Sequence, residues 1–136
     1  MPQARIVHLV FMSDPKNADF YQDLFSFLGW SVMYRGDDML GLVGPDDFSV
    51  WFGRPLNAAV NDHDGPGLNH LALGVPAQSD VDDMVAYLQR KGVPALFETP
   101  RHRPEFTRDE SQTYYQVMFT SPDDIQFEVV YTGPKA

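Results

Sequence analysis

Three side chains with the chemistry of metal ligands, His8, His70 and Glu128, stand at matching places in two halves of the sequence. Two imidazoles and one carboxylate leave coordination positions open on a divalent cation. This is the ligand set of non-haem Fe(II) oxygenases, and it also suits Mn(II), Zn(II) or Ni(II). A substrate oxygen could bind such a cation, which would serve as Lewis acid and template. No local motif joins the three residues, so the prediction depends on an internal repeat.

The repeat consists of an apolar strand pattern, a helical stretch that ends at glycine, and a Pro-Asp-Asp turn before a short apolar strand. The strand patterns span residues 6–11 and 68–73, and the turns span 45–47 and 122–124. A duplicated unit defines which positions correspond. His8 then corresponds to His70, and Trp51 corresponds to Glu128.

The first half is predicted to fold as a strand, a helix and three strands. Asp14 can cap the helix, with Pro15 at its first position, and Gly29 can end it. Phe20, Leu24 and Leu28 repeat every four residues, as in the apolar stripe of a helix. The strands are expected at residues 5–12, 31–35, 39–43 and 48–53.

The second half repeats this order after a linker at residues 54–67. Ser79 and Asp82 resemble a capping box, and Gly92 can end the helix. The strands are expected at residues 68–75, 95–98, 114–120 and 125–131, and a long polar loop is expected at 99–112. Loops of that length are usually functional lids or disordered, and the sequence leaves both open.

Strand alternation puts both candidate histidines, Glu128 and Trp51 on the face of the strands that the helices do not cover. An unpaired buried carboxylate is costly, so Glu128 needs a partner within its apolar strand. A cation held by the two imidazoles would supply one. The alternative is an arginine from the polar loop, Arg101 or Arg103. Trp51 suits either a substrate platform or a plain cavity wall.

The bulk composition bounds the functions to be considered. At 136 residues the chain is long enough for one domain with a real core. A net charge of -9 argues against nucleic acid or anionic membrane as a partner, because phosphates would be repelled. The absence of cysteine excludes disulfides and thiolate chemistry. No signal peptide or membrane-spanning apolar run stands out, so the expected location is cytoplasmic.

The paired units resemble the vicinal oxygen chelate superfamily, which includes glyoxalase I, bleomycin-resistance proteins, fosfomycin-resistance enzymes and extradiol dioxygenases. The resemblance covers nearly the whole chain, and the closing hairpin is its most specific part. The segments that carry it are residues 6–9, 20–30, 68–73 and 114–128.

The resemblance implies an α+β fold in which two βαβββ modules form a curved mixed sheet around a cavity. The modules would span residues 1–57 and 66–136 of a single domain, 1–136. The resemblance also implies a homodimer, and it matches His8, His70 and Glu128 to three metal-ligand positions of the superfamily.

Departures from the superfamily's patterns narrow the activity. Trp51 stands where glyoxalase I usually has an acidic ligand, so a glyoxalase of that type is not expected. Met118 stands where many fosfomycin enzymes and extradiol dioxygenases have a tyrosine, and Tyr114 lies on the same strand face four residues earlier. No clear basic cluster adjoins Glu128 to receive a phosphonate.

The leading hypothesis is a metal-dependent enzyme, most like a ring-cleaving dioxygenase or a resistance lyase or transferase, that chelates an oxygenated small molecule. Tyr114 is the candidate for proton transfer. The residues expected to bind the substrate are Trp51, Gln116, Met118 and Arg101. The alternative is a metal-free protein that sequesters a drug or metabolite, as bleomycin-resistance proteins do.

Overall fold

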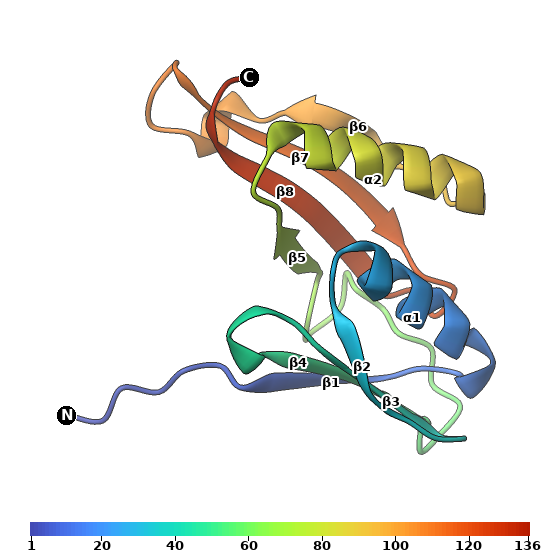
Figure 1. Cartoon of the computed structure of the whole chain (residues 1–136). Coiled ribbons are helices and arrows are strands. Elements are labelled where there is room, and N and C mark those ends of the chain that lie inside the picture. The colour runs from blue at the N-terminus through green and yellow to red at the C-terminus, as the bar shows by residue number, and fades with distance from the viewer. The chain divides into compact units, whose positions relative to one another are not determined.

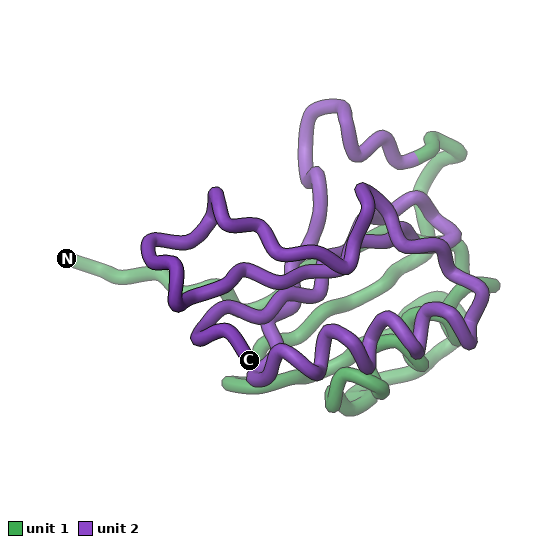
Figure 2. The backbone as a smooth tube through the Cα atoms, turned by 90° about the horizontal axis from the view of Figure 1, so that it is seen from above, with its two compact units in different colours: residues 1–60 green, residues 61–136 purple.

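The computed structural model describes all residues, 1–136, and they form two compact units, residues 1–60 and 61–136 (Figure 2). Each unit is a four-stranded mixed sheet with one α-helix packed against it (Figure 1). Neither α-helix is long and apolar enough to cross a membrane. Whether both units make one domain stays a prediction.

The first unit has the order strand, helix, strand, strand, strand. Its sheet runs β1-β4-β3-β2, with β1 and β4 parallel and the other neighbours antiparallel. Short 3₁₀ turns precede the helix and β4, at Pro15–Asn17 and Pro45–Asp47. The elements are β1 (His8–Met12), α1 (Ala18–Phe27), β2 (Ser31–Arg35), β3 (Met39–Val43) and β4 (Ser49–Gly53).

The second unit has the same order and the same topology, β5-β8-β7-β6, with β5 and β8 parallel. A 3₁₀ turn, η3 (Pro104–Phe106), lies between its second and third strands. The elements are β5 (Leu71–Gly74), α2 (Gln78–Lys91), β6 (Leu96–His102), β7 (Gln112–Thr120) and β8 (Gln126–Pro134). The predicted α+β fold of two βαβββ modules is therefore confirmed.

An aromatic cluster holds α1 on the first sheet. The ring of Tyr21 stacks on Phe52 with centroids 4.0 Å apart, and Phe25 packs edge-on to Phe52. Phe11 of β1 stacks on the same ring. Burying these large rings supplies much of the driving force for the unit, and it fixes Phe52 in the core.

The start of α2 differs from the prediction. The helix begins at Gln78, and its N-cap is Ala77 rather than Ser79. The carboxylate of Asp80 accepts a hydrogen bond from the backbone N–H of Ala77 at 2.9 Å, so only the carboxylate half of a capping box is formed. Gly92 ends the helix in the left-handed region, as predicted.

The predicted loop at residues 99–112 was too long, because β6 continues to His102. The register shifts between Leu96, opposite Met118, and Arg101, opposite Gln116, so extra residues of β6 form a bulge. The buried hydroxyl of Thr99 donates to the carbonyl of Leu96 and accepts from the N–H of Met118. These bonds keep a proline-containing segment in the sheet.

Strand registers confirm the repeat residue by residue. In the first unit His8 lies opposite Ser49, and Val10 lies opposite Trp51. In the second unit Ala72 lies opposite Glu128, in the same relation to His70 as Val10 has to His8. Trp51 and Glu128 are therefore structurally equivalent positions.

Candidate active site

Glu128 is the centre of a polar network within the second unit. The residue is only 2% exposed. The hydroxyl of Tyr114 and the amide of Gln116, both from β7, donate hydrogen bonds to its Oε2 atom at 2.6 and 2.5 Å. Two donors on one oxygen hold the carboxylate in a fixed orientation and leave Oε1 for another partner.

That partner is His70, whose Nε2 atom lies 3.1 Å from Oε1 of Glu128. The other ring nitrogen, Nδ1, lies 2.7 Å from Oδ1 of Asn69. The Asn69 amide nitrogen donates to the carbonyl of His63 at 2.9 Å, which fixes the amide so that Oδ1 faces the ring. An amide oxygen only accepts, so Nδ1 of His70 carries a proton.

This arrangement turns the lone pair of a neutral His70 toward a carboxylate oxygen. Two acceptors face each other unless a proton or a cation lies between them. Two ligands that each lie roughly 2.1 Å from one cation, at right angles, are about 3 Å apart. Histidine ligands also commonly donate their second N–H to an oxygen acceptor, as His70 does to Asn69. The pair fits a divalent cation.

Neither unit by itself brings together three His, Asp or Glu side chains suited to a metal. The predicted third ligand, His8, belongs to the first unit and begins β1. Its side chain is exposed and shares a sheet face with Ser49 and Trp51. That His8 joins His70 and Glu128 stays a prediction.

Trp51 lies flat on the first sheet. Its indole N–H donates to Ser49 Oγ at 3.0 Å, and its ring lies over Gly41, where a Cβ atom would meet the ring at 2.5 Å. Tyr34 flanks it with ring centroids 6.3 Å apart. Gly41 and Trp51 are cross-strand partners, as Met118 and Glu128 are in the second unit. The first module therefore has an apolar aromatic face where the second has the polar network.

Of the residues predicted to bind the substrate, Gln116 contacts the Glu128 network, and Met118 and Arg101 lie beside it in the sheet. Gln116 is buried and bonds directly to Glu128, and Met118 is its neighbour across the β7–β8 ladder. Arg101 is a backbone neighbour of Gln116 in β6, but its guanidinium makes no hydrogen bond or ion pair with Gln116 or Glu128. The alternative in which an arginine pairs directly with Glu128 is therefore not realised within this unit.

Arg103 reaches the network indirectly. Its Nη1 atom donates to Oε1 of Gln116 at 3.0 Å, which directs the amide nitrogen of Gln116 toward Glu128. The guanidinium also pairs with Glu105 and lies 4.8 Å from the ring centre of Phe106. The segment after β6 is thereby tied to the carboxylate through one glutamine.

Tyr114 is held as a protonated phenol. Burial, together with its hydrogen bond to Glu128 and the negative charge there, raises the pKa of Tyr114 to about 12. The ring of Phe106 packs edge-on against it, with centroids 5.2 Å apart. At neutral pH the hydroxyl therefore keeps its proton and acts as a donor.

Two side chains of this network, Asn69 and Gln126, were not among the predicted site residues. Asn69 fixes the proton on His70, and Gln126 donates to Asn69 at 3.3 Å while its own buried Oε1 atom has no partner. Gln126 precedes Glu128 by two residues on the same strand face, so alternation alone could have indicated it. Asn69 lies outside β5, where no periodic signal exists.

Comparison with known proteins identifies the architecture of the chain. No family model matches the sequence, and no curated protein matches it. A presumed glyoxalase from Bacillus halodurans superposes with a TM-score of 0.79 at 21% identity, over 95% of this chain and 96% of that chain. The chain has the vicinal oxygen chelate fold.

Two further solved structures share this vicinal oxygen chelate fold. A glyoxalase/dioxygenase from Nostoc punctiforme matches with a TM-score of 0.69 at 12% identity, over 95% of this chain and 91% of that chain. A lactoylglutathione lyase from Agrobacterium tumefaciens matches with a TM-score of 0.65 at 16% identity, over 96% of both chains. The resemblance predicted from the sequence is confirmed at the level of the fold.

Proposed function

We propose that this protein is a metal-dependent enzyme that binds an oxygenated small molecule, with His8, His70 and Glu128 holding one divalent cation. The observation that carries the proposal is the 3.1 Å approach of His70 Nε2 to Glu128 Oε1, with the proton of His70 held on the opposite ring nitrogen. A nitrogen-rich site with one carboxylate suits Fe(II), Mn(II), Ni(II) or Zn(II). When bound, such a cation polarises a substrate oxygen and stabilises negative charge that develops on it.

The surrounding residues have separate roles in this proposal. Gln116 and Tyr114 hold the Glu128 carboxylate in place through Oε2. Tyr114 is also the proposed group for proton transfer, and its raised pKa keeps the hydroxyl protonated at neutral pH. Trp51 and Met118 would exclude water and orient the apolar part of a substrate.

The reaction class that best suits a site with open coordination positions is ring-cleaving oxygenation, with lyase or transferase chemistry as the next choice. Solved structures with the same fold include proteins described as a glyoxalase/dioxygenase and as a lactoylglutathione lyase. Trp51 occupies the position equivalent to Glu128, where a fourth acidic ligand would otherwise stand. The proposal therefore favours a three-ligand site over the four-ligand site of glyoxalase I.

A second candidate function is metal-free sequestration of a drug or metabolite. A protonated His70 would form an ion pair with Glu128 at the observed 3.1 Å, which satisfies both groups without a cation. The aromatic face around Trp51 and Tyr34 would then suit a flat apolar ligand.

Elemental analysis separates the two functions. Untagged protein would be loaded anaerobically with Fe(II), Mn(II), Ni(II) or Zn(II), dialysed, and measured for metal per chain. The enzyme proposal expects about one ion per chain. The variants His8→Ala, His70→Ala and Glu128→Gln should lose it, and the control His102→Asn should keep it. Protein that retains none of the four metals would support sequestration, and turnover of catechols or epoxides by the loaded protein would establish the reaction.

A further inference from the structure

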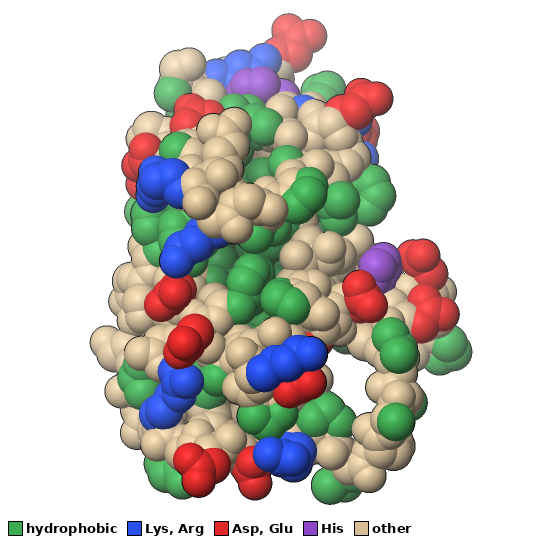
Figure 3. All heavy atoms as spheres, turned by 90° about the vertical axis from the view of Figure 1, so that its right-hand side faces the viewer, with side chains coloured by type: hydrophobic (Ala, Val, Ile, Leu, Met, Phe, Trp, Pro, Cys, Tyr) green, Lys and Arg blue, Asp and Glu red, His purple; other side chains and the backbone are tan.

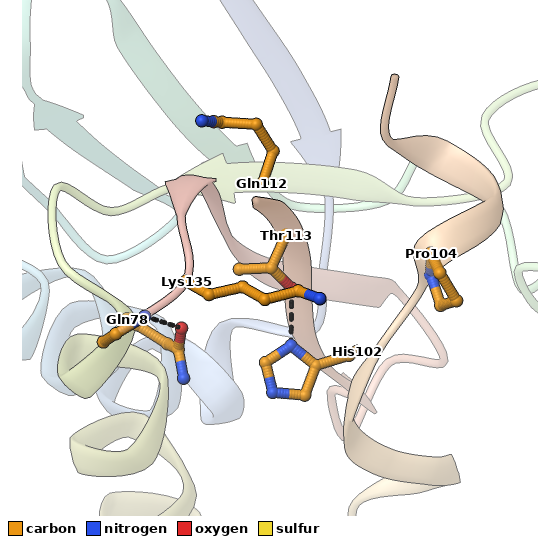
Figure 4. Close-up of a pocket in the computed structure, with 7 residues that line it drawn as sticks. Gln78, His102, Pro104, Gln112, Thr113 and Lys135 are labelled. Atoms are coloured by element: carbon orange, nitrogen blue, oxygen red, sulfur yellow. Dashed lines mark hydrogen bonds between the residues drawn. The ribbon is translucent and has the colours of Figure 1, made fainter. Parts of the chain in front are cut away.

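The second unit contains a cavity that the Glu128 network does not use. Its volume is about 350 Å³, close to the lower end of the range for small-molecule sites. Five of its lining side chains are polar (Figure 4). The residues that line it are Gln78, His102, Pro104, Gln112, Thr113, Lys135 and Ala136.

This cavity and the Glu128 network lie on opposite faces of one sheet. Thr113 and Tyr114 are neighbours in β7, and side chains alternate along a strand. Tyr114 bonds to Glu128, whereas the hydroxyl of Thr113 lies 2.5 Å from Nδ1 of His102. The cavity is therefore a separate site and does not extend the first.

Contacts with two residues of β7 hold the imidazole of His102 in place in the cavity. Thr113 is only 3% exposed, and the imidazole of His102 packs on the ring of Tyr115 with centroids 4.5 Å apart. The bond from Thr113 occupies Nδ1 and leaves Nε2 of His102 without a partner. One ring nitrogen is therefore available to a ligand.

Lys135 supplies the charge. Its backbone N–H is bonded to the carbonyl of Ser111 at 3.0 Å, but its ammonium makes no ion pair or hydrogen bond. Figure 4 shows Lys135 among the residues that line the cavity with Thr113 and His102. The Oε1 atom of Gln78 accepts a hydrogen bond from the N–H of Ala136, so the side-chain amide nitrogen of Gln78 is a free donor. A cation and several donors thus line the cavity together.

Three side-chain carboxylates of the same unit already have partners. Asp82 accepts from the hydroxyl of Tyr115 at 2.7 Å, and Asp80 accepts from the backbone of Ala77 at 2.9 Å. Asp109 accepts from the backbone and side chain of Ser111, and these bonds hold its pKa below the usual value. The free ammonium is left to select a negatively charged ligand.

We propose that this cavity binds a small molecule through a carboxylate or phosphate group, with Lys135 and His102 contacting the oxyanion. Lysine acts as a point charge for such groups, and hydrogen bonds to charged partners are stronger than neutral ones. Gln78 would contact another polar atom of the ligand. This site does not depend on the metal proposed at Glu128.

The test follows the four histidine Cε1–H signals by NMR at fixed pH and ionic strength. His102→Asn assigns its own signal. Inorganic phosphate and succinate are the two probes, and glycerol is the neutral control. The proposal expects a saturable shift of the His102 signal with one of the two anions, with a dissociation constant on the order of millimolar. The anion whose titration saturates, phosphate or succinate, is the oxyanion that the cavity prefers.

Lysine variants make the test specific. Lys135→Met should weaken binding about tenfold or more, because it removes a charged partner. Lys91→Met, at the other end of α2, should leave the affinity unchanged. Unsaturated shifts with both anions, shifts confined to other histidines, or equal affinity in Lys135→Met would overturn the proposal.

Discussion

The Nε2 atom of His70 lies 3.1 Å from Oε1 of Glu128, although Asn69 holds the proton of a neutral His70 on the opposite side of the ring. This geometry needs a third participant, either an added proton or a cation. No arginine pairs with Glu128, and the apolar side chains of the surrounding strands offer it no partner. The consequences can be tested one residue at a time.

Asn69→Ala should weaken metal binding about 10- to 100-fold, as loss of an outer-shell partner commonly does. The physical reason is that His70 would no longer be held in the tautomer that presents a lone pair at Nε2. Competition with a chelating dye measures the affinity. Asn61→Ala is the matched control, because Asn61 donates only to the backbone of Asp124. An unchanged affinity in Asn69→Ala would show that Asn69 has no role in the site.

Gln116→Leu should lower the free energy of unfolding by about 1–3 kcal/mol. The change removes a buried donor to Glu128 and leaves Arg103 without its acceptor on β7. Urea denaturation of the metal-free protein gives the value. Gln89→Leu, at an exposed position of α2, should change it by less than about 0.5 kcal/mol. Equal effects of the two substitutions would argue that the network contributes nothing to stability.

Ionisation of tyrosine gives a pH-dependent test. The pKa of Tyr114 is raised to about 12, so its bond to Glu128 stabilises the fold below pH 10 and is lost as the pH rises toward 12. Titration of phenolate absorbance should show a late step near that pH. Tyr114→Phe should remove part of this step. A second part should remain from Tyr115, whose pKa burial and the bond to Asp82 also raise to about 12.

The stability difference between the wild type and Tyr114→Phe checks the sign. It should be constant below pH 10 and should shrink between pH 10 and 12, because the wild type loses its hydrogen bond there. A difference that grows over this range would contradict the assignment of Tyr114 as the donor.

Gly41→Ala should displace the indole of Trp51, since a Cβ atom at this position would lie 2.5 Å from the ring. The expected results are a shift in tryptophan emission and weaker binding of an aromatic ligand. Gly74→Ala in β5 is the control, because nothing lies within 4 Å of its Cβ position. Unchanged emission in Gly41→Ala would mean that the ring does not rest on β3.

Much of the fold was predictable because the chain repeats its own pattern. Alternation along β8 predicts that Glu128 points away from the face shared by Phe127 and Val129, and the ladder registers agree. The same logic puts Trp51 at the equivalent position of the first unit. Periodicity and register are local properties, so the sequence reveals them.

The features that the sequence did not predict depend on hydrogen bonds from side chains to other parts of the chain. Arg103 comes from a connection after β6, and nothing in its neighbourhood indicates that its guanidinium bonds to Gln116. The extension of β6 to His102 was missed because Pro100 and several charges are typical of a loop, while the hydroxyl of Thr99 holds the strand in place. The N-cap of α2 is Ala77 rather than Ser79, and the side chain of Asp80 accepts a hydrogen bond from the backbone N–H of Ala77.

The face of the molecule drawn in Figure 3 has Lys and Arg side chains interspersed with Asp and Glu, without a continuous basic patch. The predictions that the protein avoids nucleic acid and forms a homodimer stay predictions. Size-exclusion chromatography with light scattering would measure the oligomeric state directly.

X-ray diffraction at the absorption edge of bound manganese tests the metal site most directly. We expect one anomalous peak roughly 2.0–2.3 Å from Nε2 of His70 and from Oε1 of Glu128, with His8 as the third protein ligand. A metal-soaked crystal with no peak beside these atoms, or with its peak on other side chains, would contradict it.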